Sequence, residues 1–280
     1  MTLLGAAEIR ELAEELGIKP AKSLGQNFVI DANVCRKIVR TAGVISSDVA
    51  LEIGPGLGSL TLALLEEAKS VIAVEIDERL ATRLPQTIAA HNESAATFSV
   101  IHQDALHLKS LPEAPTVLVA NLPYNVSVPV LLHLLEIFPT LKSGVVMVQA
   151  EVADRMAAGP GSKIYGVPSV KMAWYGEVTK AGSVGRNVFW PAPNVDSGLV
   201  RLVRKERDID PALRELTFTI VDAAFGQRRK TLRTALGSAL GSPQIVEGIL
   251  RDAGVDPGLR GEQLSLQDFV AIAQSAKKVI

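Results

Sequence analysis

The sequence predicts a doubly wound α/β sheet followed by a small C-terminal all-helical domain. Five short apolar runs alternate with stretches of helical periodicity through the first 150 residues. Runs that are apolar throughout are typical of strands buried on both faces of a parallel sheet, and strand–helix alternation builds such a sheet. Beyond about residue 210 only helical patterns remain, punctuated by Gly and Pro.

The predicted elements begin with an acidic amphipathic helix in MTLLGAAEIRELAEELG. The expected strands are VALEI (49–53), VIAVEI (71–76), FSVIH (98–102), TVLVA (116–120) and VVMVQ (145–149). Helical patterns such as SLTLALLEEA and VPVLLHLLEIF lie between them, and KMAWYGEVTKAG and SGLVRLVR are interpreted as antiparallel additions to the sheet. The charged stretch RKERDIDP is interpreted as a linker, which gives domains of residues 1–205 and 206–280. The second contains the helical stretches ELTFTIVDAAF, KTLRTALGSAL, PQIVEGILRDAG and SLQDFVAIAQSA.

The composition limits the possible function. Of 280 residues, 48% are hydrophobic and 21% charged, which indicates a globular protein with ample core. Because the net charge is −1, any nucleic-acid surface must be a local patch. With one cysteine, Cys35, the chain cannot form an internal disulfide, and the apolar stretch around Cys35 predicts that it is buried. The four histidines lack the spacing of a metal site, so we expect no metal. The N-terminus has no basic start, and no run approaches the ~20 apolar residues of a membrane span, so we expect a cytoplasmic protein.

A glycine-rich turn follows the first predicted strand. Gly54, Gly56 and Gly58 form GxGxG, and Ser59 stands where the dinucleotide fingerprint has its third glycine. Glycines at the start of a helix let the backbone approach a ligand closely. Alone, the pattern also fits a plain strand–helix turn.

Two acids lie at the ends of the next two predicted strands. Glu75 lies 21 residues after Gly54, where a carboxylate accepts both ribose hydroxyls, and Asp104 can accept a hydrogen bond from an adenine amino group. Either acid alone fits a solvated loop, but three successive strand ends meet at the edge where open α/β sheets bind ligands. The arrangement resembles the class I methyltransferases, which bind S-adenosylmethionine. NAD is the alternative cofactor, although it leaves Asp104 without a role.

The fourth predicted strand ends in Asn121, Leu122, Pro123 and Tyr124. These four residues fit the pattern [DNS]-[IL]-P-[YF]. At this strand end they resemble the signature of class I methyltransferases that methylate a planar amino nitrogen. The Asn121 oxygen and the Leu122 or Pro123 carbonyl can accept the two N–H bonds of such a group, while Tyr124 stacks on its ring. Catalysis would then rest on orientation and electrostatics. The alternative is turn chemistry with a packed tyrosine.

Four further stretches resemble the ribosomal RNA adenine dimethyltransferases: KSLGQNFVID, AGPGSKIYGVPSV, FWPAPNVDSGLVRL and FGQRRKTLRTAL. The resemblance covers nearly the whole chain and is greatest to the bacterial small-subunit enzymes, which dimethylate two adjacent adenosines. It implies a Rossmann-like class I methyltransferase fold, with S-adenosylmethionine as donor and S-adenosylhomocysteine as product. It also implies action on 16S ribosomal RNA in the small subunit, late in ribosome biogenesis. We expect a monomer with no metal and no membrane partner.

The resemblance also implies the site residues. The expected cofactor contacts are Gln26, Asn27, Val29, Gly54, Gly56, Gly58, Glu75, Ile76, Asp104, Ala105 and Asn121. Val29 stands where the family usually has Leu, and its contact is expected through the backbone. Phe189 is expected as a second aromatic face opposite Tyr124, with plain core packing as the alternative. Trp190 beside it is interpreted as packing.

A basic segment is the candidate RNA surface. The segment from Arg201 to Arg233 contains nine basic and five acidic residues, which gives it a local charge of +4. Arg228, Arg229, Lys230 and Arg233 cluster at a predicted helix start, where phosphate contacts would give salt-dependent affinity. A solvated helix end or an interdomain salt bridge is the alternative. The target adenine must be unpaired or flipped out to be reached.

Two rival functions share parts of this pattern. A large-subunit (23S) adenine methyltransferase that confers antibiotic resistance would have the same NLPY core, but SKIYGVPSV and FGQRRKTLR favour the small-subunit enzyme. A noncatalytic RNA-binding assembly or transcription factor could use the same fold. The complete set of cofactor positions from Gly54 to Tyr124 favours an enzyme.

Overall fold

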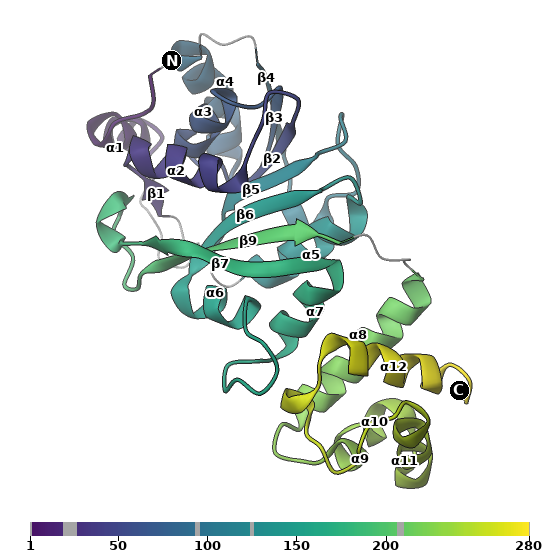
Figure 1. The fold of residues 1–280 in the computed structure, drawn as a ribbon. Coiled ribbons are helices and arrows are strands. Elements are labelled where there is room, and N and C mark those ends of the chain that lie inside the picture. Colours follow the sequence, from purple (N-terminus) through teal and green to yellow (C-terminus); the bar gives the residue numbers. More distant parts are fainter. Residues whose placement is uncertain (1, 19–26, 93–95, 124–125, 206–209, 280) are drawn as a thin grey trace. The chain divides into compact units, whose positions relative to one another are not determined.

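The computed structural model (Figure 1) forms two compact units. It describes residues 2–18, 27–92, 96–123, 126–205 and 210–279. The sheet unit comprises Met1–Ala153 and Val178–Arg204, and the helical unit comprises Asp154–Glu177 and Lys205–Ile280. Within the described ranges, no helix is long and apolar enough to span a membrane.

The sheet unit is built on seven strands in the order β4-β3-β2-β5-β6-β9-β7. Their bounds are β2 (Val49–Ile53), β3 (Ser70–Glu75), β4 (Thr97–His102), β5 (Val117–Asn121), β6 (Ser143–Gln149), β7 (Gly176–Val184) and β9 (Ser197–Arg204). Strands β2 to β6 are parallel, and β9 is antiparallel to β6. All five predicted parallel strands are confirmed. Strands β2, β3, β5 and β6 are buried almost throughout, as continuous apolar runs in a covered parallel sheet predict, whereas the edge strand β4 is partly exposed.

The strand order reverses between β2 and β5. From β2 the chain moves outward to β3 and β4, and then returns to the other side of β2 as β5 and β6. A ligand crevice is expected at such a switch point, outside the carboxyl ends of the strands. The ends of β2 and β5 are indeed close: a Cβ added to Gly54 would lie 3.8 Å from the Asn121 carbonyl oxygen.

Helices cover both faces of this sheet. They are α1 (Ala6–Glu15), α2 (Ala32–Ala42), α3 (Ser59–Leu65), α4 (Glu78–His91) and α5 (Ser127–Ile137); α6 (Ala150–Met156) crosses the division between the units. Figure 1 shows α2 on one side of the central strands and α5 on the other. The Asp31 carboxylate caps α2 by accepting from the amides of Asn33 and Val34. Cys35 on α2 is fully buried as expected, and burial raises the pKa of its thiol to about 12.

The helical unit contains α7 (Val167–Tyr175) with α8 (Pro211–Gly226), α9 (Leu232–Ala235), α10 (Gly237–Leu240), α11 (Pro243–Asp252) and α12 (Leu266–Ala276). The predicted helical character of the C-terminal segment is confirmed. The predicted strand in KMAWYGEVTKAG is wrong over its first five residues, which belong to α7. Pro168 in the first turn starts this helix, and the buried side chains of Met172, Trp174 and Tyr175 hold it in place.

The division between the units differs from the expected domains in one segment. The C-terminal part begins at Lys205, close to the expected boundary, but residues 154–177 also cluster with the C-terminal helices. Aromatic packing explains this difference. The Phe218 ring on α8 lies edge-on to Trp174 at 5.8 Å, and the Tyr165 ring meets Phe225 at 5.8 Å. The catalytic and RNA-binding roles assigned to the two domains stay predictions.

Candidate functional site

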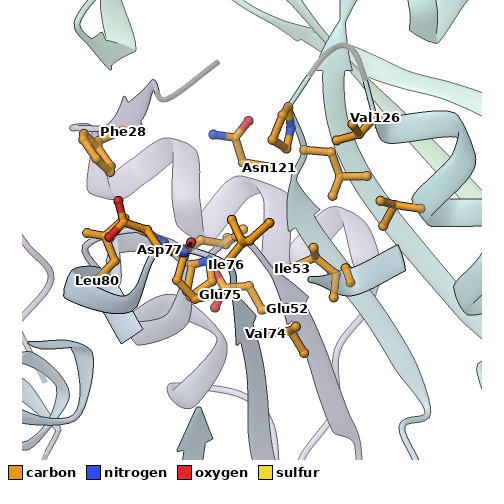
Figure 2. Close-up of a pocket in the computed structure, with 18 of the residues that line it drawn as sticks. Phe28, Glu52, Ile53, Val74, Glu75, Ile76, Asp77, Leu80, Asn121 and Val126 are labelled. Atoms are coloured by element: carbon orange, nitrogen blue, oxygen red, sulfur yellow. Dashed lines mark hydrogen bonds between the residues drawn. The ribbon is translucent and has the colours of Figure 1, made fainter. Parts of the chain in front are cut away.

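A cavity of about 450 Å³ lies at the carboxyl edge of the sheet, between the ends of β2, β3 and β5 (Figure 2). Its wall includes most of the expected cofactor residues: Asn27, Val29, Gly54, Gly56, Glu75, Ile76, Asp104, Ala105 and Asn121. Leu122 and Pro123 of the NLPY stretch also line it. Gln26 and Tyr124 lie outside the described residues. The fold thus gathers residues from five separate stretches of sequence around one cavity.

Gly56 sits at the tightest point of the glycine turn. Its φ of +59° is disfavoured for other residues, and an added Cβ would lie 3.0 Å from the Phe28 ring. With no side chain here, its amide donates a hydrogen bond of 3.2 Å to Glu75 Oε2. The turn is therefore fixed to the end of β3 by its own backbone.

Glu75 is held in place by backbone donors. Its Oε1 accepts from the Asp77 amide at 2.9 Å, while its Oε2 accepts from Gly56. Burial raises the pKa of Glu75, and these backbone hydrogen bonds oppose the shift. Each carboxylate oxygen has a second lone pair, so the group can still accept bonds from two hydroxyls of a ligand.

The ends of β4 and β3 supply a polar and an apolar residue, respectively, to the cavity wall. Asp104 Oδ1 accepts from the Leu106 amide at 2.9 Å, and its Oδ2 lies 3.3 Å from His107 Nδ1. Ile76, which follows β3, is 65% exposed although it lines the cavity. An exposed aliphatic side chain beside an acceptor suits a flat ring that has a donor on its edge.

Gly58 and Phe189 are not in the cavity wall. A Cβ on Gly58 would lie 2.9 Å from Leu84 Cδ1, so this glycine allows α3 to pack closely against α4. Phe189 is 4% exposed and belongs to the hydrophobic core. It lies in β8 (Phe189–Trp190), which pairs with β1 (Phe28–Val29). The aromatic ring in the described wall is instead Phe28, on which Trp190 stacks at 6.4 Å.

Glu52 lines the cavity although sequence reasoning missed it. Its side chain is 1% exposed, and its Oε2 has no hydrogen-bond partner among the described residues. Burial, and then the charge of Glu75, raise the pKa of Glu52 to about 8, and the Thr61 side chain opposes the shift. An acid inside the apolar run VALEI was the available signal. The other missed polar residues of the wall are Ser59, Asp77 and Gln103.

The expected RNA residues divide into two kinds in the helical unit. Arg228 donates to Glu262 Oε2 at 3.0 Å and to the carbonyls of Lys163 and Tyr165, so it ties a loop to the end of α8. Arg233 is paired with Glu247 at 3.3 Å. Arg229 and Lys230 are exposed and form no ion pair with a described residue. The part of the chain that the structure describes holds no cluster of three or more His, Cys, Asp or Glu arranged to bind a metal.

The strand order, the glycine turn and the acids at the ends of β3 and β4 define a Rossmann-like methyltransferase of class I. More particularly, the chain belongs to the ribosomal RNA adenine dimethylase family, whose model matches residues 18–278. The chain is 62% identical, over 276 residues, to the ribosomal RNA small subunit methyltransferase A of Streptomyces avermitilis. That match covers 98% of this chain and 94% of the relative.

Two solved structures share the fold over most of the chain. A dimethyladenosine transferase from Plasmodium falciparum superposes with a TM-score of 0.77 and 27% identity, covering 90% of this chain and 98% of that one. The 23S rRNA methyltransferase ErmE superposes with a TM-score of 0.66 and 27% identity, covering 90% of this chain and 100% of its own. The name of the first refers to dimethyladenosine, and the name of the second refers to methyl transfer to 23S rRNA.

Proposed function

We infer that this protein transfers methyl groups from S-adenosylmethionine to the amino nitrogens of adenines in 16S ribosomal RNA. Membership of the family supports adenine dimethylation, and the high identity to named small-subunit methyltransferases supports the 16S target. ErmE, the large-subunit enzyme, is 27% identical, which favours the small-subunit assignment. We propose two adjacent adenosines in a loop near the 3′ end as the sites, modified late in ribosome biogenesis.

The cavity fits the proposed donor. Glu75 presents two acceptor oxygens for ribose hydroxyls, and Asp104 with Ile76 forms an edge for adenine. The orphaned Glu52 oxygen is a buried acceptor near which a cationic ligand is favourable. When bound, S-adenosylmethionine supplies a methyl group on a positively charged sulfur. Gly56 has no Cβ, so we propose that the backbone of the glycine turn approaches that ligand closely.

The observation that carries the proposed chemistry is the orientation of Asn121. Its Nδ2 donates to the Asn27 carbonyl oxygen at 3.1 Å, so the amide cannot be flipped without losing that bond. The Oδ1 is therefore available as an acceptor for an adenine amino group. That nitrogen is a poor nucleophile because its lone pair is delocalised into the ring. Accepting its N–H bonds at Asn121 and at the Leu122 or Pro123 carbonyl orients the lone pair toward the donor methyl.

No strong general base is required in this scheme. The amino nitrogen becomes acidic as it gains the methyl group, and its proton can pass to solvent. Positioning and charge stabilisation therefore account for the rate. We propose that Tyr124 stacks on the target base, that Arg229 and Lys230 contact phosphates, and that the protein acts as a cytoplasmic monomer without a metal.

Methyl transfer into small subunits from cells that lack this modification tests the function. Purified protein with labelled S-adenosylmethionine should label 16S RNA, and mass mapping should place dimethyladenosine at two adjacent positions. Large subunits from the same cells serve as the matched control. Label confined to 23S RNA would support the rival enzyme, whereas cofactor binding without any transfer would support a noncatalytic RNA-binding factor.

A further inference from the structure

Glu52 is the least satisfied charged side chain in the described cavity wall. It is 1% exposed, and no described residue donates a hydrogen bond to its Oε2. In the parallel register Glu52 lies beside Ala73, so Glu75, two residues further along β3, projects from the same face of the sheet. Figure 2 shows both carboxylates in the same pocket.

Among the described residues, the groups that face Glu52 carry no positive charge. From β3 it faces the Glu75 carboxylate, and from α3 it faces Thr61. From α2 it faces the Cys35 thiol, whose pKa is raised first by burial and then by the Glu52 charge. No described Lys, Arg or His forms an ion pair with Glu52.

Glu75 differs from Glu52 in the hydrogen-bond donors that surround its carboxylate. Both carboxylates are buried, but Glu75 accepts from two backbone amides, of Gly56 and Asp77. A buried carboxylate without such backbone donors is costly when charged, so Glu52 holds a proton as long as no ligand is bound. This proton remains until a ligand supplies positive charge. Glu52 is therefore poised to sense the charge of whatever fills the cavity.

We propose that Glu52 ionises when S-adenosylmethionine binds, and that this coupling favours the cationic donor over its neutral product. The inference rests on the proposed function. The proton leaves the Glu52 carboxyl for solvent, and no bond is made or broken in the ligand. S-adenosylhomocysteine lacks the charge on sulfur, so it leaves Glu52 more fully protonated. The residue would thus help the enzyme to exchange product for fresh donor between the two transfers to one nitrogen.

The expected effect of Glu52 on ligand affinity follows from the linkage between ligand binding and ionisation of its carboxyl. An opposite charge close by lowers a carboxyl pKa by roughly 1–3 units, and each unit corresponds to about tenfold in affinity at high pH. The ratio of affinities, donor over product, should therefore fall by about tenfold or more in Glu52→Gln at pH 8. The amide keeps the shape of the side chain but cannot ionise.

Isothermal calorimetry in two buffers of different protonation enthalpy measures the released proton directly. At pH 7 the parent protein should release roughly one half to one proton per S-adenosylmethionine bound, and fewer per S-adenosylhomocysteine. Because the donor's own amino group titrates near this pH, the difference between parent and variant carries the test. Glu52→Gln should lose the proton release that belongs to Glu52. Glu75→Gln should bind S-adenosylmethionine more weakly but keep that proton release.

The outcomes separate the inference from the function on which it rests. If the parent does not bind S-adenosylmethionine at all, the proposed function fails. If the parent binds it but releases no more protons than Glu52→Gln does, only the role of Glu52 is overturned. Release that persists in folded Glu52→Gln but disappears in Glu75→Gln would assign the proton to Glu75 and also overturn the inference. Thermal unfolding of each variant establishes that it is folded.

Discussion

The side-chain nitrogen of Asn121 donates a hydrogen bond of 3.1 Å to the carbonyl oxygen of Asn27, 94 residues earlier in the chain. This bond joins the end of β5 to the residue before β1 and fixes which way the amide faces. Both residues line the cavity at the switch point of the sheet. One contact therefore closes the cavity wall and also orients the proposed acceptor for the target base.

Glu75→Ala should weaken S-adenosylmethionine binding by about 1–3 kcal/mol, the usual loss for a hydrogen-bond partner that is charged. Affinity for RNA measured without cofactor should hardly change. Calorimetry of the folded variant checks this. Glu113→Ala is a matched control, because Glu113 contacts Ser70 at the opposite end of β3. Equal cofactor affinity in Glu75→Ala and the parent would remove Glu75 from the site.

Gly56→Ala should both destabilise the protein and weaken cofactor binding. The positive φ costs about 1–3 kcal/mol for a residue with a Cβ, and that Cβ would press on the Phe28 ring at 3.0 Å. Gly43→Ala is the control, since Gly43 has a similar φ of +69° but open space around it. Chemical unfolding should show a loss in both variants, whereas only Gly56→Ala should bind S-adenosylmethionine less tightly. A normal cofactor affinity in Gly56→Ala would contradict the close approach proposed here.

The basic residues after α8 should separate by function. Arg229→Ala with Lys230→Ala should reduce the slope of log affinity for RNA against log salt by roughly two units, about one per phosphate contact. Arg228→Ala should instead lower the free energy of unfolding by about 1–2 kcal/mol, because its guanidinium holds Glu262 and two carbonyls. RNA titrations at several salt concentrations and urea unfolding distinguish the two effects. An unchanged slope in the double variant would exclude these side chains from the RNA surface.

The stability of the ligand-free protein should fall with pH because of Glu52. Its pKa is raised from 4.5 to about 8, so between these values the folded chain holds a proton that the unfolded chain has lost. The free energy of unfolding then decreases by on the order of 1.4 kcal/mol per pH unit across that window, and levels off above it. Glu52→Gln has no carboxyl to titrate at this position, so its stability does not fall for this reason. Its free energy of unfolding, measured in urea relative to the parent, should therefore increase from pH 5 to pH 8. A constant difference would mean that Glu52 is charged throughout.

Much of the fold could be predicted from the sequence because its signals are local. Each parallel strand is a continuous apolar run, and the chain order of strands and helices limits how the sheet can wind. Gly56, Glu75 and Asp104 could be predicted to line the cavity because each lies at a strand end or within three residues after it. The carboxyl ends of parallel strands share one edge, so position along the chain translated into position in space.

The features that could not be predicted depend on distant contacts. The role of Gly58 follows from the position of Leu84 on another helix. Phe189 is placed by the pairing of two very short strands about 160 residues apart. Arg228 has the same local pattern as Arg229, and only the fold brings Glu262 to it. Glu52 was hidden because an acid inside an apolar strand contradicts the pattern by which strands are recognised.

The central claim is that Asn121 aligns the amino group that is methylated, and single-turnover methyl transfer by Asn121→Ala tests it most directly. With small-subunit RNA and S-adenosylmethionine both saturating, the rate should fall by ~10²–10³-fold, the loss typical of one well-placed polar group. Thermal unfolding must show that the variant is folded, and calorimetry must show that the donor still saturates it. A folded, saturated Asn121→Ala protein that transfers methyl groups at close to the parent rate would contradict the proposed mechanism.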